Sequence, residues 1–279
     1  MPIARLAYMP LVTYPEAVPD DNVASALALA AALSCDVHAT TFAVDIPRVS
    51  TPIGGLIINI PEMIRTTEER SLANCQRLQD LVRDRAGTRV KALCSNRQTF
   101  PGEMGNVAAK ESRYFDLALL AWAKDHIVTQ DLAQAVVFGA GRPAVLVPAS
   151  VRSEPISHVA VAWDASRVAA RALADAMPLL ADGTRITVLT VQDEKTLGGK
   201  NLAEDLAASL ETRGLQAQAQ NIQIGRRTIA EALQEAALEA SAGLLVMGGF
   251  GHSRVRDFIL GGATKGVLTD LRLPVLLSH

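Results

Sequence analysis

Glycines cluster near the end of the chain in a spacing that suits phosphate binding. Gly248, Gly251 and Gly261 form the pattern G-x2-G-x9-G and follow the apolar run 244–247. Glycine permits positive φ angles and lets backbone N–H groups come close to an oxyanion. A helix expected to begin near Ala263 adds unpaired N–H groups and a partial positive charge. The pattern therefore predicts a phosphate-binding loop, with an ordinary surface loop as the alternative.

The residues around these glycines exclude two other nucleotide-binding loops and give no catalytic apparatus. A Walker-type loop would end in Gly-Lys-Ser/Thr, whereas Lys265 lies inside the expected helix. A dinucleotide fingerprint would follow the first strand of its unit, where this half has Asp164–Ser166. His252 and Ser253 are adjacent, so their side chains point apart, and no third partner of a triad is evident. No metalloprotease or nucleophile-elbow motif and no metal-ligand spacing of histidines occurs either.

Strands must position these residues, and strand and helix patterns alternate through the second half of the chain. The expected strands are 159–163, 185–191, 216–224, 244–247 and 274–277, and the expected helices are 167–180, 202–213, 228–240 and 263–271. Such alternation is typical of a parallel sheet covered by helices on both faces. The glycine loop and Asp164 then share the carboxyl edge of the sheet, where open α/β sheets bind ligands.

The first half repeats this order less clearly. Its expected strands are 5–9, 37–44, 89–94, 117–121 and 141–147, and its expected helices are 22–33 and 62–85. The segment 141–147 resembles 271–277, which indicates an internal duplication. We therefore expect an α/β protein with two tandem, open, mostly parallel five-stranded sheets and helices on both faces. The expected domains are residues 1–148 and 156–279.

Composition bounds the class of protein. The chain has 279 residues, of which 49% are hydrophobic, and a net charge of −2. It can bury a core, and it carries no bulk charge that would attract nucleic acid or anionic lipid. Three cysteines without a CxxC pair fit a reducing compartment. The chain has no run of 18 apolar residues and a poor signal-peptide pattern, so the expected location is the cytoplasm, with no membrane partner.

The C-terminal half resembles the nucleotide-binding kind of universal stress protein domain. The family's hallmark is the glycine spacing described above, followed by Ser or Thr. The resemblance extends over nearly all of residues 155–279, and the whole chain resembles the tandem, two-domain version. It implies that an adenine nucleotide (ATP, ADP or AMP) is bound, with Mg²⁺ brought in by the phosphates. The implied role is stress-response signalling with little or no hydrolysis.

The resemblance also assigns individual positions. It places Asp164 at the adenosine, Val191 at the adenine ring, and the glycine loop along the ribose and phosphates. The implied nucleotide-binding residues are Ala162, Trp163, Asp164, Val191, Met247, Gly248, Phe250, Gly251, His252, Ser253, Gly261, Gly262, Ala263 and Thr264. Two positions depart from the pattern. Gly262 stands where the family has Ser or Thr, and Ala165 stands where a glycine is common.

Several alternatives stay open for single residues and for the function. Asp164 can instead cap the next helix, and Trp163 can be a buried strand residue. Arg254 and Arg256 can contact phosphates or be solvated. A dimerisation scaffold that has lost its nucleotide, and an adenine-nucleotide-dependent enzyme of the same fold, are the rival functions.

The N-terminal half lacks the features of a nucleotide site. Ala121 aligns with Gly248, and the following segment 121–130 has no glycine, although it has Asp125. Met9–Pro10 aligns with Trp163–Asp164 and carries no acid. We therefore expect one nucleotide per chain, and in the first half either a structural partner or a less charged ligand.

The two halves are also expected to pair. In single-domain family members, the last strands cover each other across a dimer, so the resemblance implies that the two proline-led last strands pair internally in a pseudo-dimer. A homodimer of the whole chain stays open. The apolar segment 46–61 has no counterpart in the second half. It is expected to be a flap, an oligomer contact or a pocket lid.

Overall fold

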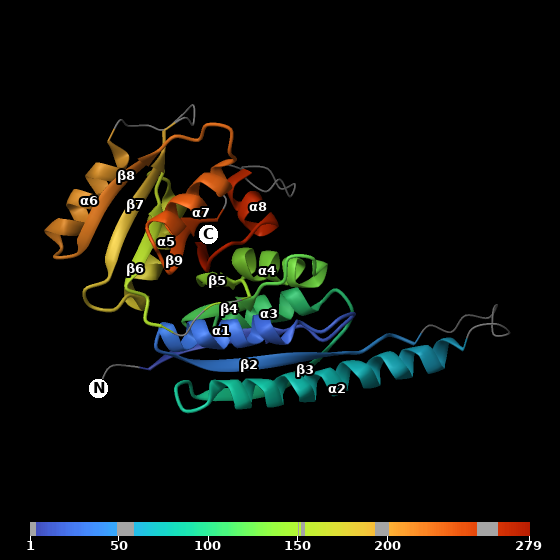
Figure 1. Cartoon of the computed structure of the whole chain (residues 1–279). Coiled ribbons are helices and arrows are strands. Elements are labelled where there is room, and N and C mark those ends of the chain that lie inside the picture. Colours follow the sequence, from blue (N-terminus) through green and yellow to red (C-terminus); the bar gives the residue numbers. More distant parts are fainter. Residues whose placement is uncertain (1–3, 49–58, 150, 152–153, 193–200, 250–261) are drawn as a thin grey trace.

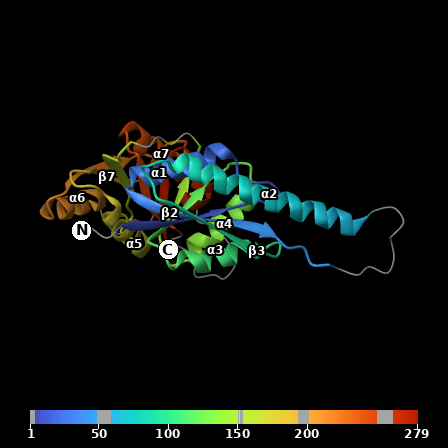
Figure 2. The same ribbon diagram turned by 90° about the horizontal axis from the view of Figure 1, so that it is seen from below.

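The structure is a computed structural model, which describes residues 4–48, 59–149, 151, 154–192, 201–249 and 262–279. In the first half, the strands are β1 (Arg5–Leu11), β2 (Cys35–Val44), β3 (Ala92–Thr99), β4 (Leu117–Ala121) and β5 (Ala144–Val147), and the helices are α1 (Asp20–Ala32), α2 (Ile60–Ala86), α3 (Met104–Ser112) and α4 (Ile127–Gly139). α2 extends well beyond the sheet (Figure 2), and Arg65 on its outer part pairs with Glu62 and Glu69.

The second half follows the same order. Its strands are β6 (His158–Ala162), β7 (Arg185–Val191), β8 (Gln216–Ile222), β9 (Leu244–Gly248) and β10 (Val275–Ser278), and its helices are α5 (Arg167–Ala176), α6 (Leu202–Thr212), α7 (Ile229–Glu239) and α8 (Gly262–Thr269). The α/β class expected from the sequence is confirmed (Figure 1). None of the described helices is long and apolar enough to cross a membrane.

The ten strands form one continuous sheet rather than two separate ones. Their order is β3-β2-β1-β4-β5-β10-β9-β6-β7-β8, and neighbours within each half run parallel. At the centre β5 and β10 pair antiparallel, with Val145 opposite Leu276, and both side chains are fully buried. The expected pairing of the two last strands is therefore confirmed, and it merges the two five-stranded sheets.

Two hydrophobic cores lie on opposite faces of this sheet. One contains apolar residues of α1, α2, α5 and α6, and the other contains those of α3, α4, α7 and α8. Successive residues of a strand point to opposite faces, so Ala7 belongs to the first core and Tyr8 to the second. Each core crosses the β5–β10 junction, which makes the two halves one packed body.

Local contacts hold three helix ends close to where the sequence predicts them. Ser166 accepts a hydrogen bond from the Ala169 N–H at the start of α5, at 3.2 Å. Thr228 and Glu231 form a capping box at the start of α7. Gly214 follows α6 with φ +82°, a conformation that glycine adopts at little cost. These ends are correct because each depends on residues within one turn of the chain.

Three expectations for the first half are wrong in part. β3 is Ala92–Thr99 rather than 89–94, since its partner β2 pairs with it as far as Val44 opposite Thr99. The sequence does not predict α3, because this helix has only nine residues and many of its side chains are small. α4 begins at Ile127, within the segment 121–130 expected to be a loop. Buried Leu132, Val136 and Val137 bring that helix onto the sheet.

The strand ladders relate the two halves position by position. Val159 pairs with Leu244 and with Ile186, while Ala7 pairs with Leu117 and with Val37. Counting five residues onward, Asp164 corresponds to Val12 and Val191 corresponds to Phe42. Gly248, four residues after Leu244, corresponds to Ala121, as the sequence analysis has it. The alignment of Trp163–Asp164 with Met9–Pro10 is wrong by two residues, because register is set by the neighbouring strands. The first half still has no acid there.

Buried His158 predicts a pH dependence of stability. It starts β6 with 3% of its surface exposed, and its Nε2 lies 2.8 Å from Thr187 Oγ1. Burial, and secondly the charge of Arg185, lower the pKa of His158 below its ordinary value. The unfolded chain therefore takes up a proton near pH 6.5 that the folded chain does not, and stability falls as the pH drops below that value.

Urea unfolding at pH 7.5 and pH 5.5 measures this effect. We expect the wild type to lose more unfolding free energy over this interval than His158→Gln, since glutamine stays neutral. Carboxylates are ionised at both values, so they contribute little to the difference. Equal losses in the two proteins would contradict the assignment.

Candidate nucleotide site

The carboxyl ends of three neighbouring strands bring the candidate residues together. β6 lies between β7 and β9 in the sheet. Asp164 follows β6, Val191 ends β7 and Gly248 ends β9. This edge faces the start of α5, and α8 begins beyond the loop that follows β9. A negative side chain and the N-terminus of α5 therefore lie at one edge, which is where open α/β sheets bind ligands.

Asp164 stabilises its own turn through one carboxylate oxygen. Its Oδ1 accepts a hydrogen bond from the Ser166 N–H at 2.9 Å. This contact is an Asx turn ahead of α5, and the side chain that caps the helix is that of Ser166; Asp164 Oδ2 has no partner among the described residues. The residue between them, Ala165, has φ +59°, a left-handed conformation that costs a non-glycine residue about 1 kcal/mol. A glycine at this position would remove that cost.

Trp163 is a half-buried residue packed on the core. Its ring packs against the core that contains α5 and α6. Its backbone is held on both sides, because its N–H donates to Leu189 O at 2.8 Å and its carbonyl accepts from Thr190 Oγ1 at 2.9 Å. The alternative of a buried strand residue is therefore wrong in part, because Trp163 is half-buried and follows the end of β6 at Ala162. Ala162, Val191 and Met247 belong to the opposite core, so they shape the other side of this edge.

Gly248 has a packing role that the sequence analysis did not identify. A Cβ atom at this position would lie 2.7 Å from Ala169 N, Val168 C and Val168 Cγ2. The absence of a side chain therefore lets β9 come against the first turn of α5. The next residue, Gly249, donates its N–H to Ser278 O at 2.7 Å, and its carbonyl lies 3.0 Å from His279 Nδ1. This stretch of backbone is consequently fixed before the loop begins.

The first residue of α8 is exposed, and the two residues that follow it are increasingly buried. Gly262 is exposed, and a Cβ atom there would meet no atom of the described residues within 4 Å. Ala263 is half-buried and Thr264 is buried. A Cβ at Gly266 would lie 2.5 Å from Ala230 Cβ, so this glycine brings α8 against α7.

Part of the predicted site lies outside the described residues. These positions are Phe250, Gly251, His252, Ser253 and Gly261, together with Arg254 and Arg256.

Two features of the described residues could contact a nucleotide. Asp164 Oδ2 is an acceptor suited to a ribose hydroxyl, and Gly262 at the start of α8 leaves room for a phosphate. In the part of the chain that the structure describes, no three His, Cys, Asp or Glu residues come together as metal ligands.

Comparison with known proteins supports the class that the fold and the site define. The model of the Universal stress protein family matches residues 155–279. A universal stress protein from Archaeoglobus fulgidus aligns with a TM-score of 0.69 at 15% identity, covering 97% of each chain. A putative universal stress protein from Pseudomonas aeruginosa aligns with a TM-score of 0.53 at 13% identity, covering 97% of this chain and 92% of that one. The search of curated proteins gives no match.

The C-terminal half is therefore a universal stress protein domain. The first half has the same order of strands and helices, and the alignment with the Archaeoglobus fulgidus protein runs through both halves. The first half therefore has the same fold as the second, and the fold of the whole chain is similar to that of the Archaeoglobus fulgidus universal stress protein.

Proposed function

We propose that this protein binds one adenine nucleotide, ATP or its hydrolysis products, in its C-terminal half and acts as a cytoplasmic stress-response signalling protein. The observation that carries the proposal is the shared edge of β6, β7 and β9. There Asp164, Gly248 and the start of α8 have the order that the family's nucleotide pattern requires. Mg²⁺ would enter with the phosphates, and turnover is expected to be slow or absent. The domains are proposed as residues 1–148 and 156–279.

One nucleotide per chain follows from the difference between the halves. At the positions of Asp164 and Gly248 the first half has Val12 and Ala121, both of them buried. Neither supplies a carboxylate for a ribose, and α4 begins only six residues after Ala121, at Ile127. Close backbone approach to a triphosphate is therefore disfavoured in that half.

Gly262 offers a clean test because a Cβ atom there would contact none of the described residues, so we expect the fold to tolerate a side chain. We expect Gly262→Glu to weaken ATP binding at least about 10-fold, since a carboxylate at the start of α8 repels phosphates. Gly262→Ala is the matched control and should bind within about threefold of the wild type. Isothermal titration of the full-length chain measures both affinity and stoichiometry, and native mass spectrometry identifies any co-purified nucleotide.

The outcomes separate the proposal from its rivals. Saturation at one ATP per chain with loss in Gly262→Glu supports it, and saturation at two overturns the asymmetry of the halves. No binding at all would favour the dimerisation scaffold. Rapid hydrolysis that is lost in Asp164→Ala would favour an enzyme of the same fold.

A further inference from the structure

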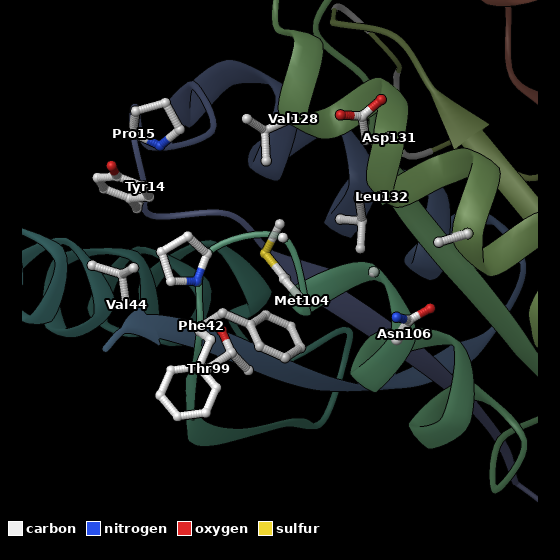
Figure 3. Close-up of a pocket in the computed structure, with 15 residues that line it drawn as sticks. Tyr14, Pro15, Phe42, Val44, Thr99, Met104, Asn106, Val128, Asp131 and Leu132 are labelled. Atoms are coloured by element: carbon white, nitrogen blue, oxygen red, sulfur yellow. The ribbon is translucent and has the colours of Figure 1, made fainter. Parts of the chain in front are cut away.

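A cavity of about 270 Å³ lies at the carboxyl edge of the N-terminal half (Figure 3). The loop after β1, the ends of β2 and β3, and helices α3 and α4 all contribute to its walls. Tyr14 and Val44 lie on one side, Leu132 lies on the other, and Met104 extends between them above Phe42. The cavity is thus assembled from five segments, all of them described.

This cavity lies at the carboxyl edge of the first half and shares one position, Phe42, with the counterparts of the candidate nucleotide site. Phe42 in its wall is the counterpart of Val191. Each of them lies five residues beyond a corresponding position of its half, Val37 in the first half and Ile186 in the second. α4 in its wall follows β4, as α8 follows β9. The duplication therefore places the cavity at the ligand-binding edge of an open α/β sheet.

The lining has a different chemistry from a phosphate site. Aromatic, aliphatic and thioether side chains make up most of it, including Phe42, Met104 and Val128. These groups favour an aromatic ring, which packs well against other rings and against sulfur. Asp131 is the one charged residue among the lining residues, and it is exposed at the upper edge of the cavity. Among the residues that the structure describes, no lysine, arginine or histidine lines the cavity, so a phosphate would meet only the negative charge of Asp131.

We propose that this cavity binds a small aromatic molecule that carries a positive charge, of the class of arylalkylamines. The ring lies between Phe42, Met104 and Leu132, and the ammonium group faces Asp131. The size is adequate, because a dry apolar cavity of about 150 Å³ holds benzene and this cavity is larger. The tandem protein would then bind two different ligands, one in each half, on one continuous sheet.

Titration of the full-length protein with tryptamine tests the proposal. We expect saturable binding of one tryptamine per chain, with a Kd between about 10 μM and 1 mM for a ligand of this size. Indole-3-acetate, which has the same ring and a negative charge, should bind at least about threefold more weakly. Asp131→Asn should remove this difference while leaving binding of neutral indole unchanged.

Two variants place the ligand in the cavity. Val128→Trp and Met104→Trp fill it from opposite walls, and each should reduce tryptamine affinity at least about 10-fold. Ile127→Trp is the matched control, because Ile127 is 72% exposed and does not line the cavity. Circular dichroism confirms that each variant is folded, and the two filling variants stand in for each other if one is not.

The result that overturns the proposal is equally specific. Absence of saturable tryptamine binding overturns it, as does binding that both tryptophan-filled variants retain. Tighter binding of indole-3-acetate than of tryptamine also overturns it. ATP titrations of the same variants should match the wild type, so failure of this proposal is distinguishable from failure of the nucleotide site.

Discussion

Leu276→Asp should lower the free energy of unfolding by about 4 kcal/mol or more. Leu276 lies on β10 at the centre of the ten-stranded sheet, opposite Val145 of β5, and both side chains are fully buried. The substitution removes a buried leucine, and it places a carboxylate in the core without a partner. Because β10 joins the two halves, the loss falls on the whole body, and we expect both halves to unfold together. Urea unfolding followed by circular dichroism measures the change.

Leu238→Asp is the control for this prediction. Leu238 is 45% exposed on α7, so the same chemical change should cost less than about 1 kcal/mol there. A loss below 1 kcal/mol in Leu276→Asp would show that the β5–β10 junction does not hold the two halves together. Two separate transitions in the wild type would lead to the same conclusion.

Gly248→Val should destabilise the protein by about 3 kcal/mol even when no ligand is present. The Cβ atom of valine would lie 2.7 Å from backbone atoms of Val168 and Ala169, which cannot move without shifting the first turn of α5. Overpacking of a tightly packed contact commonly costs 1–3 kcal/mol, and a clash with backbone lies at the upper end of this range. Thermal and urea unfolding of the ligand-free variant measure the effect.

The comparison with Gly262 separates packing from ligand binding within one glycine motif. Gly262→Val adds the same side chain at a position where a Cβ atom meets no described residue within 4 Å. Its unfolding free energy should therefore change by no more than the difference in helix propensity between glycine and valine. If ligand-free Gly248→Val were as stable as the wild type and only ATP binding were lost, Gly248 would serve the ligand rather than the fold.

The alternating pattern of strands and helices determines the fold class without any help from tertiary structure. Strands such as Arg185–Val191 and Leu117–Ala121 have the bounds that the sequence predicts, because both are short, mostly apolar runs in a chain where strand and helix patterns alternate. Helix ends such as Ser166 and Thr228 are equally local, since a capping side chain reaches only the next turn. The proline-led apolar strands also predict their own pairing, because an unpaired apolar edge is unfavourable.

Tertiary structure decided the features that depend on contacts between distant segments. Val12, not Pro10, is the counterpart of Asp164 in the first half. This correspondence comes from the register of the hydrogen bonds between β1 and its neighbouring strands. The need for glycine at position 248 comes from the approach of α5, about 80 residues earlier in the chain. No local sequence pattern specifies the register of β1 or the contact between Gly248 and α5.

The two candidate sites differ in the same way, since one could be predicted from the sequence and the other could not. The sequence by itself determined the glycine motif, Asp164 and the loss of both in the first half, because these are matters of residue type and spacing. The cavity around Phe42 was decided only by the tertiary structure, since its walls come from segments more than 100 residues apart. A ligand site made of one loop can be predicted from the chain, whereas a cavity exists only once several elements have packed around it.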